Sequence, residues 1–391
     1  MLKGNYVKIG DVCVVERGGS PRPIDNYITD APNGINWIKI GDTTDSMYIT
    51  ETAQKITPEG MKKSRYVQPG DFLLSNSMSF GRPYILKIDG CIHDGWLVLR
   101  DNSNVFDKKF LYYYLSAPST YQKFKNMAVG GVVNNLNSEM VRGVTVPLPS
   151  KEEQIEVVDR LENITNLISL RRKQLAKLDE LVKARFVEMF GDTILNPKAW
   201  PVCNLSEHIQ FLTSGSRGWS QYFTESGEYF ITIKNVKNCR ITLDDVQYVI
   251  PPDNAEAKRT RVQEGDLLIS ITADLGRTGV VTKKIAEYGG YINQHLTCIR
   301  LNQDAVRPLY VAYYMESEAG KRQFQAKNQS AVKAGLNFNS INSLRLMVPP
   351  IELQDKFISF VEQTDKSKLA IQQSLDKLET LKKALMQKYF G

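Results

Sequence analysis

Two stretches of the chain carry apolar residues at steps of three and four, the spacing that predicts amphipathic helices. They cover residues 151–191 and 351–391, and each follows a proline and closes on a glycine. The apolar stripes are Leu161, Ile164, Ile168, Leu175, Leu178 and Val182 in the first stretch, and Phe357, Val361, Ile371, Leu375, Leu378, Leu381 and Leu385 in the second. A helix of about 40 residues is ~60 Å long and has little room for a globular core around it. Each helix therefore needs a partner helix, and the other stretch supplies one.

The two stretches are copies of one sequence at an offset of 200 residues, which aligns Pro149 with Pro349, Gln154 with Gln354 and Phe190 with Phe390. The segments between them also repeat. Residues 1–150 contain short apolar and β-branched runs bounded by Gly, Pro, Asn and Asp, which predict a strand-rich domain with long loops. Expected strands lie at 12–15, 36–40, 72–75, 84–88 and 96–100, an expected helix at 106–124, a Gly/Asn-rich loop at 126–137 and a last strand reaching Val146.

Residues 192–350 repeat this order of elements. The loop 17–23 matches 213–219 through Gly19 with Gly215 and Ser20 with Ser216, and VQPGDFLLS at 67–75 matches VQEGDLLIS at 262–270. We therefore predict an α+β fold with an internal pseudo-twofold repeat. Two β-rich domains at 1–150 and 192–350 would be separated by two long antiparallel coiled-coil helices at 151–191 and 351–391.

Composition places the chain among folded proteins, since 42% of its 391 residues are hydrophobic. It has no signal-like start and no run of ~18 apolar residues that could span a bilayer. Its five cysteines are widely spaced, as expected for reduced thiols. We expect a cytoplasmic protein without a membrane partner, and a net charge of +7 weakly favours a polyanionic one.

Catalytic motifs are missing from the sequence. It contains no G-x-x-x-x-G-K-[ST] loop, no G-x-G-x-x-G after a strand and only three histidines. Asp253, Glu256 and Lys258 resemble a nuclease set, but they share one short polar segment that has no counterpart in the first domain. We expect no catalytic residue and no metal site in this chain.

The sequence does contain side chains that can recognise nucleic acid. Arg and Lys can donate to guanine, Asn and Gln can bridge adenine, and hydroxyls can hold phosphates. Such residues cluster in the loops that differ between the two copies, and a solvated loop residue is the alternative for each of them. The candidate DNA-binding residues are Arg17, Ser20, Arg22, Lys39, Ser75, Asn76, Ser79, Arg82 and Asn134 in the first domain, and Ser216, Arg217, Lys234, Asn235, Ser270, Thr272, Arg277, Lys333 and Asn337 in the second.

Three sets of motifs recur in both halves of the chain: the turns PGDFLLS and EGDLLIS, the helix starts VPLPSKEEQI and VPPIELQDKF, and the closing MFGD and YFG. In these motifs the chain resembles the specificity subunits of type I restriction-modification systems. That resemblance covers the whole chain. It implies two target recognition domains, each reading one half of an asymmetric bipartite DNA site, and a subunit that is not itself a catalyst. It also implies two modification subunits that use S-adenosylmethionine to methylate adenine, and restriction subunits that use ATP and Mg²⁺.

For the helices we predict an inner seam of Leu161, Leu175, Leu178, Val361, Leu375 and Leu378. Phe186, Phe190, Met386 and Phe390 are candidates for contact with partner subunits, with a place in a core as an equal alternative. Two other functions are alternatives. One is a coiled-coil scaffold with two protein-binding β-rich modules, and the other is a self-contained modification and cleavage enzyme. The missing motifs argue against the enzyme.

Overall fold

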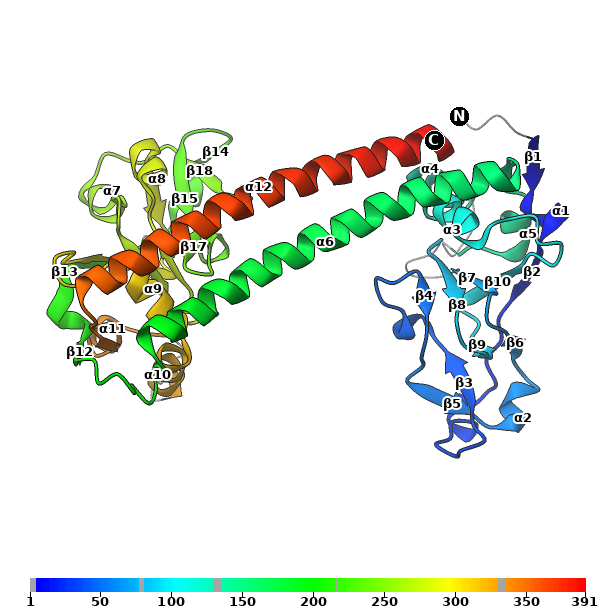
Figure 1. The fold of residues 1–391 in the computed structure, drawn as a ribbon, viewed down its shortest axis with the longest axis horizontal. Helices are drawn as coiled ribbons and strands as arrows, with labels where there is room; N and C mark the ends of the chain where they lie inside the picture. The colour runs from blue at the N-terminus through cyan, green and yellow to red at the C-terminus, as the bar shows by residue number, and fades with distance from the viewer. Residues whose placement is uncertain (1–4, 77–80, 129–134, 216, 330–334) are drawn as a thin grey trace. The chain divides into compact units, whose positions relative to one another are not determined.

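The computed structural model describes residues 5–76, 81–128, 135–215, 217–329 and 335–391. The chain divides into two compact units, each a mixture of helix and sheet (Figure 1). Unit 1 combines residues 1–173 with 372–391, and unit 2 is residues 174–371. Each unit therefore contains one β-rich segment and parts of both long helices.

The described residues of unit 1 form three sheets. The smallest pairs β1 (Asn5–Lys8) with β11 (Thr145–Leu148). The five-stranded sheet has the order β2 (Val14–Arg17), β10 (Trp96–Arg100), β7 (Phe72–Ser75), β8 (Pro83–Leu86) and β4 (Tyr48–Ile49), and the four-stranded sheet has the order β5 (Gln54–Ile56), β3 (Ile35–Ile38), β9 (Gly90–Ile92) and β6 (Arg65–Val67). Its helices are α1 (Ile9–Val12), α2 (Pro58–Met61), α3 (Lys108–Ser116), α4 (Pro118–Ala128), α5 (Ser138–Arg142), the first part of α6 (Lys151–Phe190) and the last part of α12 (Ile351–Phe390).

Unit 2 repeats the central strands of unit 1. One four-stranded sheet has the order β13 (Ile209–Ser214), β22 (Leu296–Leu301), β19 (Leu267–Ser270) and β20 (Thr278–Val280). Another has the order β14 (Phe223–Thr224), β18 (Gln247–Val249), β15 (Glu228–Ile231) and β21 (Gly290–Ile292). Two further pairs are β12 (Val202–Asn204) with β23 (Arg345–Met347), and β16 (Val236–Lys237) with β17 (Arg240–Ile241). Its helices are α7 (Ala255–Thr260), α8 (Lys283–Tyr288), α9 (Pro308–Glu316), α10 (Glu318–Gln329), α11 (Phe338–Asn342) and the remaining parts of α6 and α12.

The repeat extends to single hydrogen bonds. Gly81 N donates to Ser75 O at 2.7 Å, and Gly276 N donates to Ser270 O at 3.0 Å. Both glycines have φ of +79°, a left-handed conformation that disfavours a side chain. The predicted α+β fold with an internal repeat is thereby confirmed.

The long helices begin and end where the sequence pattern predicts, and buried glutamines explain their starts. Gln154 Nε2 donates to Pro149 O and Val105 O, each at 3.1 Å, while its Oε1 accepts from Asp107 N at 2.6 Å. Gln354 makes the matching set of bonds in unit 2. Each glutamine therefore fastens the first turn of a long helix to the loop before α3 or α9.

Within each unit the two helix segments run antiparallel. In unit 1, Arg160 Nη1 lies 3.1 Å from Tyr389 Oη, and Arg172 Nη2 lies 2.7 Å from Glu379 Oε1. In unit 2, Lys368 pairs with Asp179. The predicted seam residues Leu161, Val361 and Leu375 are buried, and Leu175, Leu178 and Leu378 are partly buried. Leu381, which the sequence pattern places in the stripe, is instead 47% exposed.

The prediction that four residues near the helix ends contact partner subunits is wrong for Phe186, Phe190 and Phe390. Phe186 and Phe190 are buried in the core of unit 2, where both rings pack against Tyr310 and Phe357. Phe390 is buried in the core of unit 1, and Met386 is partly buried against that core. These side chains have their apolar neighbours within the chain, so the core alternative describes them.

Some short elements differ from the predicted ones. The helix expected at 106–124 is two helices, because the chain is extended at Ala117 ahead of Pro118. The strand expected at 12–15 begins at Val14, since Ile9–Val12 is a short helix. Part of the loop expected at 126–137 lies outside the described residues. Among the residues that are described, no helix is long and apolar enough to cross a membrane.

Candidate nucleic-acid interface

A close approach between two chain segments positions the loop that follows β2. Gly18 N donates to Trp96 O at 2.9 Å, and a Cβ on Gly18 would lie 2.1 Å from His93 O, so only glycine fits. Gly215 has the same place in unit 2, with its N 3.1 Å from Leu296 O. The predicted match of Gly19 with Gly215 is therefore wrong by one residue, and Gly18 is the counterpart.

Asp94 is the centre of this site, and four of the predicted DNA-binding residues contact it. Its carboxylate accepts from Ser20 Oγ at 2.7 Å and from Arg22 Nη2 at 3.4 Å. Its backbone oxygen accepts from Arg17 Nε at 3.1 Å and from Asn76 Nδ2 at 2.9 Å. The hydrogen bond from Ser20 is the main cause that lowers the pKa of Asp94, which keeps the carboxylate charged.

His93 fixes the turn that carries Asp94. Its Nδ1 lies 2.6 Å from Gly95 N, and its Nε2 lies 3.2 Å from Ile40 N. A neutral imidazole has one acceptor nitrogen and one N–H, so it can accept from one of these two amides, whereas an imidazolium accepts from neither. Burial is the main cause that lowers the pKa of His93. The 3.9 Å approach of its Nδ1 to Asp94 Oδ1 is therefore not an ion pair at neutral pH.

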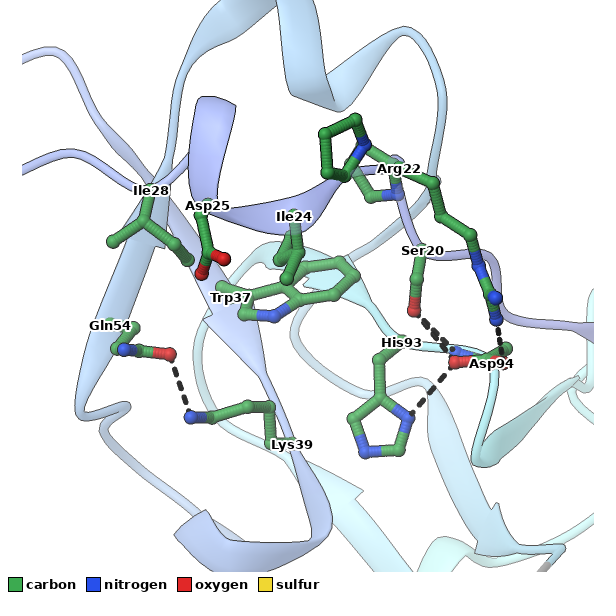
Figure 2. A pocket seen from close by; sticks show the side chains of 12 residues that line it. Ser20, Arg22, Ile24, Asp25, Ile28, Trp37, Lys39, Gln54, His93 and Asp94 are labelled. Carbon is green, nitrogen blue, oxygen red and sulfur yellow. Dashed lines mark hydrogen bonds and ion pairs between the residues drawn. The ribbon is translucent and has the colours of Figure 1, made fainter.

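These residues open onto a pocket of about 910 Å³ (Figure 2). Lys39 also lines it, and its Nζ donates to Gln54 Oε1 at 2.7 Å. Figure 2 shows the Trp37 ring between the Lys39–Gln54 pair and the loop that carries Ser20 and Arg22. The pocket thus combines cations, two carboxylates, an amide and an aromatic ring. The full lining is Ser20, Pro21, Arg22, Pro23, Ile24, Asp25, Ile28, Trp37, Lys39, Gln54, His93 and Asp94.

The other candidates of unit 1 do not join this pocket. Ser75 is only 1% exposed and its Oγ accepts from Arg82 N at 3.0 Å, so it belongs to the framework and the prediction that it contacts DNA is corrected. Asn76 is also buried, and its Oδ1 has no hydrogen-bond partner within the described part of the chain. Arg82 is exposed. Ser79 and Asn134 lie outside the described residues.

Two candidates of unit 2 are buried framework residues, which corrects their prediction as well. Asn235 Oδ1 accepts from Thr232 N at 3.0 Å, and its Nδ2 donates to Thr242 O at 3.2 Å. Ser270 Oγ accepts from Arg277 N at 2.9 Å. Turn closure occupies both side chains.

The other candidates of unit 2 that the structure describes are at least partly accessible. Thr272 Oγ1 lies 2.6 Å from His295 Nδ1, and Arg277 pairs with Asp274. Asn337 is exposed and caps α11 by accepting from Ser340 N at 2.8 Å. Arg217 and Lys234 are exposed, whereas Ser216 and Lys333 lie outside the described residues.

Sequence reasoning missed the acidic and aromatic half of the pocket: Trp37, Gln54, His93 and Asp94. A loop carboxylate is a weaker sign of DNA contact than a basic or hydroxyl side chain. The available signal was the matching pair of strands 90–100 and 290–300, between which the residues of the turn change while the strand pattern persists.

No three His, Cys, Asp or Glu side chains in the described ranges gather so that they could hold a metal ion. All five cysteines are free thiols. Cys13, Cys91, Cys239 and Cys298 are buried, and burial raises the pKa of each.

Comparison with known proteins matches this chain to one family twice. The model of the type I restriction modification DNA specificity domain matches residues 3–180 and 197–382. The type I restriction enzyme EcoKI specificity subunit of Escherichia coli strain K12 is 21% identical over 378 residues, which cover 89% of this chain and 78% of that protein. The putative MjaX specificity subunit of Methanocaldococcus jannaschii is 23% identical over 305 residues, covering 74% of this chain and 69% of the relative.

Solved structures share the fold. A chain from a study of complex assembly and conformational transition of the type I R-M system has a TM-score of 0.65 at 18% identity, covering 100% of this chain and 98% of its own length. The type I restriction-modification system S subunit from M. genitalium has a TM-score of 0.52 at 16% identity, with coverage of 100% and 97%.

Proposed function

Because this chain belongs to the type I restriction-modification DNA specificity family, it is a DNA-recognition subunit, and we propose that each of its two domains reads one half of an asymmetric bipartite site. The observation that carries this proposal is the double match of the family model, to residues 3–180 and 197–382. The two matched segments share one strand framework and differ in their loop side chains. A shared framework with different loops suits two readers of different base sequences.

The pocket of unit 1 supplies the chemistry that such reading needs. Arg22 and Lys39 line the pocket, and Arg17 contacts the backbone oxygen of Asp94 beside it. These three cations can contact phosphate or guanine, and hydroxyls such as Ser20 can hold phosphate oxygens. Arg22 is 81% exposed at its side chain, so it can leave Asp94 for a phosphate without uncovering a core. In unit 2, Arg217, Lys234 and Arg277 would have the corresponding role.

We further propose that the reactions belong to other subunits. Relatives of this chain are named specificity subunits of restriction enzymes. This chain would bind and orient DNA for two modification subunits, which methylate adenine with S-adenosylmethionine, and for restriction subunits that use ATP and Mg²⁺. It would contribute no reacting group of its own.

The long helices α6 and α12 would act as spacers between the recognition domains at 1–150 and 192–350. Each helix contains 40 residues and contributes to both units. A stiff connection through helix, rather than through a flexible linker, would fix the number of base pairs between the two half-sites.

The test is to express the chain with its modification subunit in a host that has no DNA methylation, and to map methylated adenines across the genome. We expect one bipartite motif with a fixed spacer. The control omits this chain and should give no motif. Absence of methylation would refute the proposal if the same modification subunit is active when paired with a different specificity subunit.

A further inference from the structure

Asp94 and Gln294 occupy the same position in the two units. Trp96 lies opposite Ser75 across the β10–β7 pair, and Leu296 lies opposite Ser270 across the β22–β19 pair. Asp94 lies two residues before Trp96, and Gln294 lies two residues before Leu296. Each lies within a four-residue turn. The turns close in the same way, with Trp96 N 3.2 Å from His93 O and Leu296 N 3.1 Å from Asn293 O.

The backbone around the two turns is held by matching bonds. Asn76 N donates to Gly95 O at 3.0 Å in unit 1, and Ile271 N donates to His295 O at 3.0 Å in unit 2. The glycines of the preceding loops, Gly18 and Gly215, close on both turns from the other side. The frame is therefore constant, and the functional group that it presents changes from a carboxylate to an amide.

The Asp94 carboxylate is accessible and held in place. Its side chain is 43% exposed, and it lines the pocket of Figure 2 beside cationic residues. A carboxylate only accepts hydrogen bonds when ionised, and phosphate repels it. On DNA, the complementary group is the exocyclic amino group of a base, as on cytosine N4. Ser20 Oγ, which contacts Oδ1, limits the rotation of this carboxylate and leaves it with further acceptor sites.

The Gln294 amide has a different support. Its Nε2 lies 3.2 Å from His295 Nε2, and the other ring nitrogen of His295 lies 2.6 Å from Thr272 Oγ1. An amide offers both a donor and an acceptor, the pair of groups that matches adenine N7 and N6. The side chain is half-buried, so its approach direction is restricted.

We propose that this turn position is a base-reading site in each domain, where Asp94 accepts a hydrogen bond from an exocyclic amino group and Gln294 pairs with the N6 and N7 edge of an adenine. The amino group read by Asp94 belongs to a cytosine or an adenine. This inference rests on the proposed DNA-recognition function and assigns the residues that distinguish the two half-sites.

A positioning role is the competing explanation, since Asp94 also orders Ser20, Arg17 and Arg22. The two roles differ in what they do to sequence preference. A residue that only positions phosphate-binding cations affects all DNA sequences alike, whereas a base-reading residue affects one base pair.

The experiment uses the complex of this chain with its modification subunits and duplexes that carry the mapped motif. Every base pair of the motif is substituted in turn, and affinities are measured at one salt concentration for the wild type, Asp94→Asn and Gln294→Glu. Asp94→Asn should reduce discrimination by about 5- to 150-fold at one base pair of one half-site. Gln294→Glu should do so in the other half-site only.

Base analogues identify the source of the amino group. Duplexes carry 2-pyrimidinone in place of each cytosine, or purine in place of each adenine, so that single amino groups are removed. The analogue at the Asp94 contact should weaken DNA binding by the wild type but leave DNA binding by Asp94→Asn nearly unchanged. The base whose analogue has this effect is the base that Asp94 contacts. Asp89→Asn, which removes an equal charge from the same unit, should behave as the wild type at every position.

Equal weakening of all duplexes by Asp94→Asn would overturn the inference and leave a positioning role. Unchanged preference in both half-sites would overturn it as well. A wild-type complex that recognises no motif would instead contradict the proposed function itself, so the two failures are distinguishable.

Discussion

At the scale of residues, His93 links protonation to the shape of the pocket. Its buried neutral ring lies against the amides of Gly95 and Ile40, and the charges nearest to it are Asp94, Lys39 and Asp42. The neutral ring can accept from one of these two amides, and protonation would remove that acceptor. The turn that presents Asp94 therefore depends on a neutral imidazole.

This dependence predicts an acid-sensitive turn in unit 1. The pKa of His93 is lower in the folded chain than the ordinary value of about 6.5, so the folded state favours the neutral ring. Its stabilising effect is complete above about pH 6.5 and is lost as the pH falls through the folded pKa. Hydrogen exchange over residues 90–100, corrected for its intrinsic pH dependence, should show greater opening on acidification between about pH 7.5 and 5.

His93→Asn, which copies Asn293 of unit 2, is the matched variant and should abolish this acid response. An equal response in wild type and variant would assign the effect to another group.

Residue-level predictions from sequence were limited by burial. The sequence shows that Ser75, Ser270 and Asn235 are polar and lie in divergent segments, but their oxygens close turns inside the domains. Asp94 has no comparable signal in the sequence, because three of the side chains that contact it lie 72 to 77 positions earlier and only the fold brings them together.

At the scale of elements, long periodic segments were the predictable part. The helices at 151–190 and 351–390 were predicted to within one residue, because an apolar period summed over some 40 positions outweighs local exceptions. The loop match through Gly19 was wrong because the real constraint is the contact of Gly18 with His93 O, a tertiary approach with no local sequence signal.

The aromatic residues at the helix ends are buried in the cores of different units, Phe390 in unit 1 and Phe190 in unit 2. This difference leads to a second prediction. Phe390 packs against Phe110 and Tyr114 with ring centroids 5.5 and 5.9 Å apart. Phe390→Ala should destabilise unit 1 by about 3–5 kcal/mol, as expected for a large cavity in a core. Phe190→Ala should do the same to unit 2 and leave unit 1 unchanged.

Hydrogen exchange resolved by peptide would assign each loss to its unit. The control is Leu381→Ala on the same helix as Phe390, where 47% exposure limits the expected change to about 0.5 kcal/mol. Loss of protection in unit 2 upon Phe390→Ala would contradict the assignment of residues 372–391 to unit 1.

At the scale of the whole molecule, the spacer role of α6 and α12 is testable through length. Four extra residues in each helix add ~6 Å, and DNA rises ~3.4 Å per base pair, so the mapped spacer should lengthen by about one or two base pairs. Four residues are close to one helical turn, which keeps the apolar seam nearly in phase. Methylation mapping of the active variant measures the new spacer.

The same four residues placed in the exposed turn at 101–104 should leave the spacer unchanged. An active helix-insertion variant that methylates the original motif would show that the helices do not set the spacing.

The assignment of residues 372–391 to unit 1 also orders events during synthesis. Unit 1 starts at the beginning of the chain, yet Tyr389 and Phe390 belong to its core. The ribosome delivers all of unit 2, residues 174–371, before it delivers these two side chains. Folding along the nascent chain can thus finish the second recognition domain first, while the first waits with an incomplete core for the last helical turns.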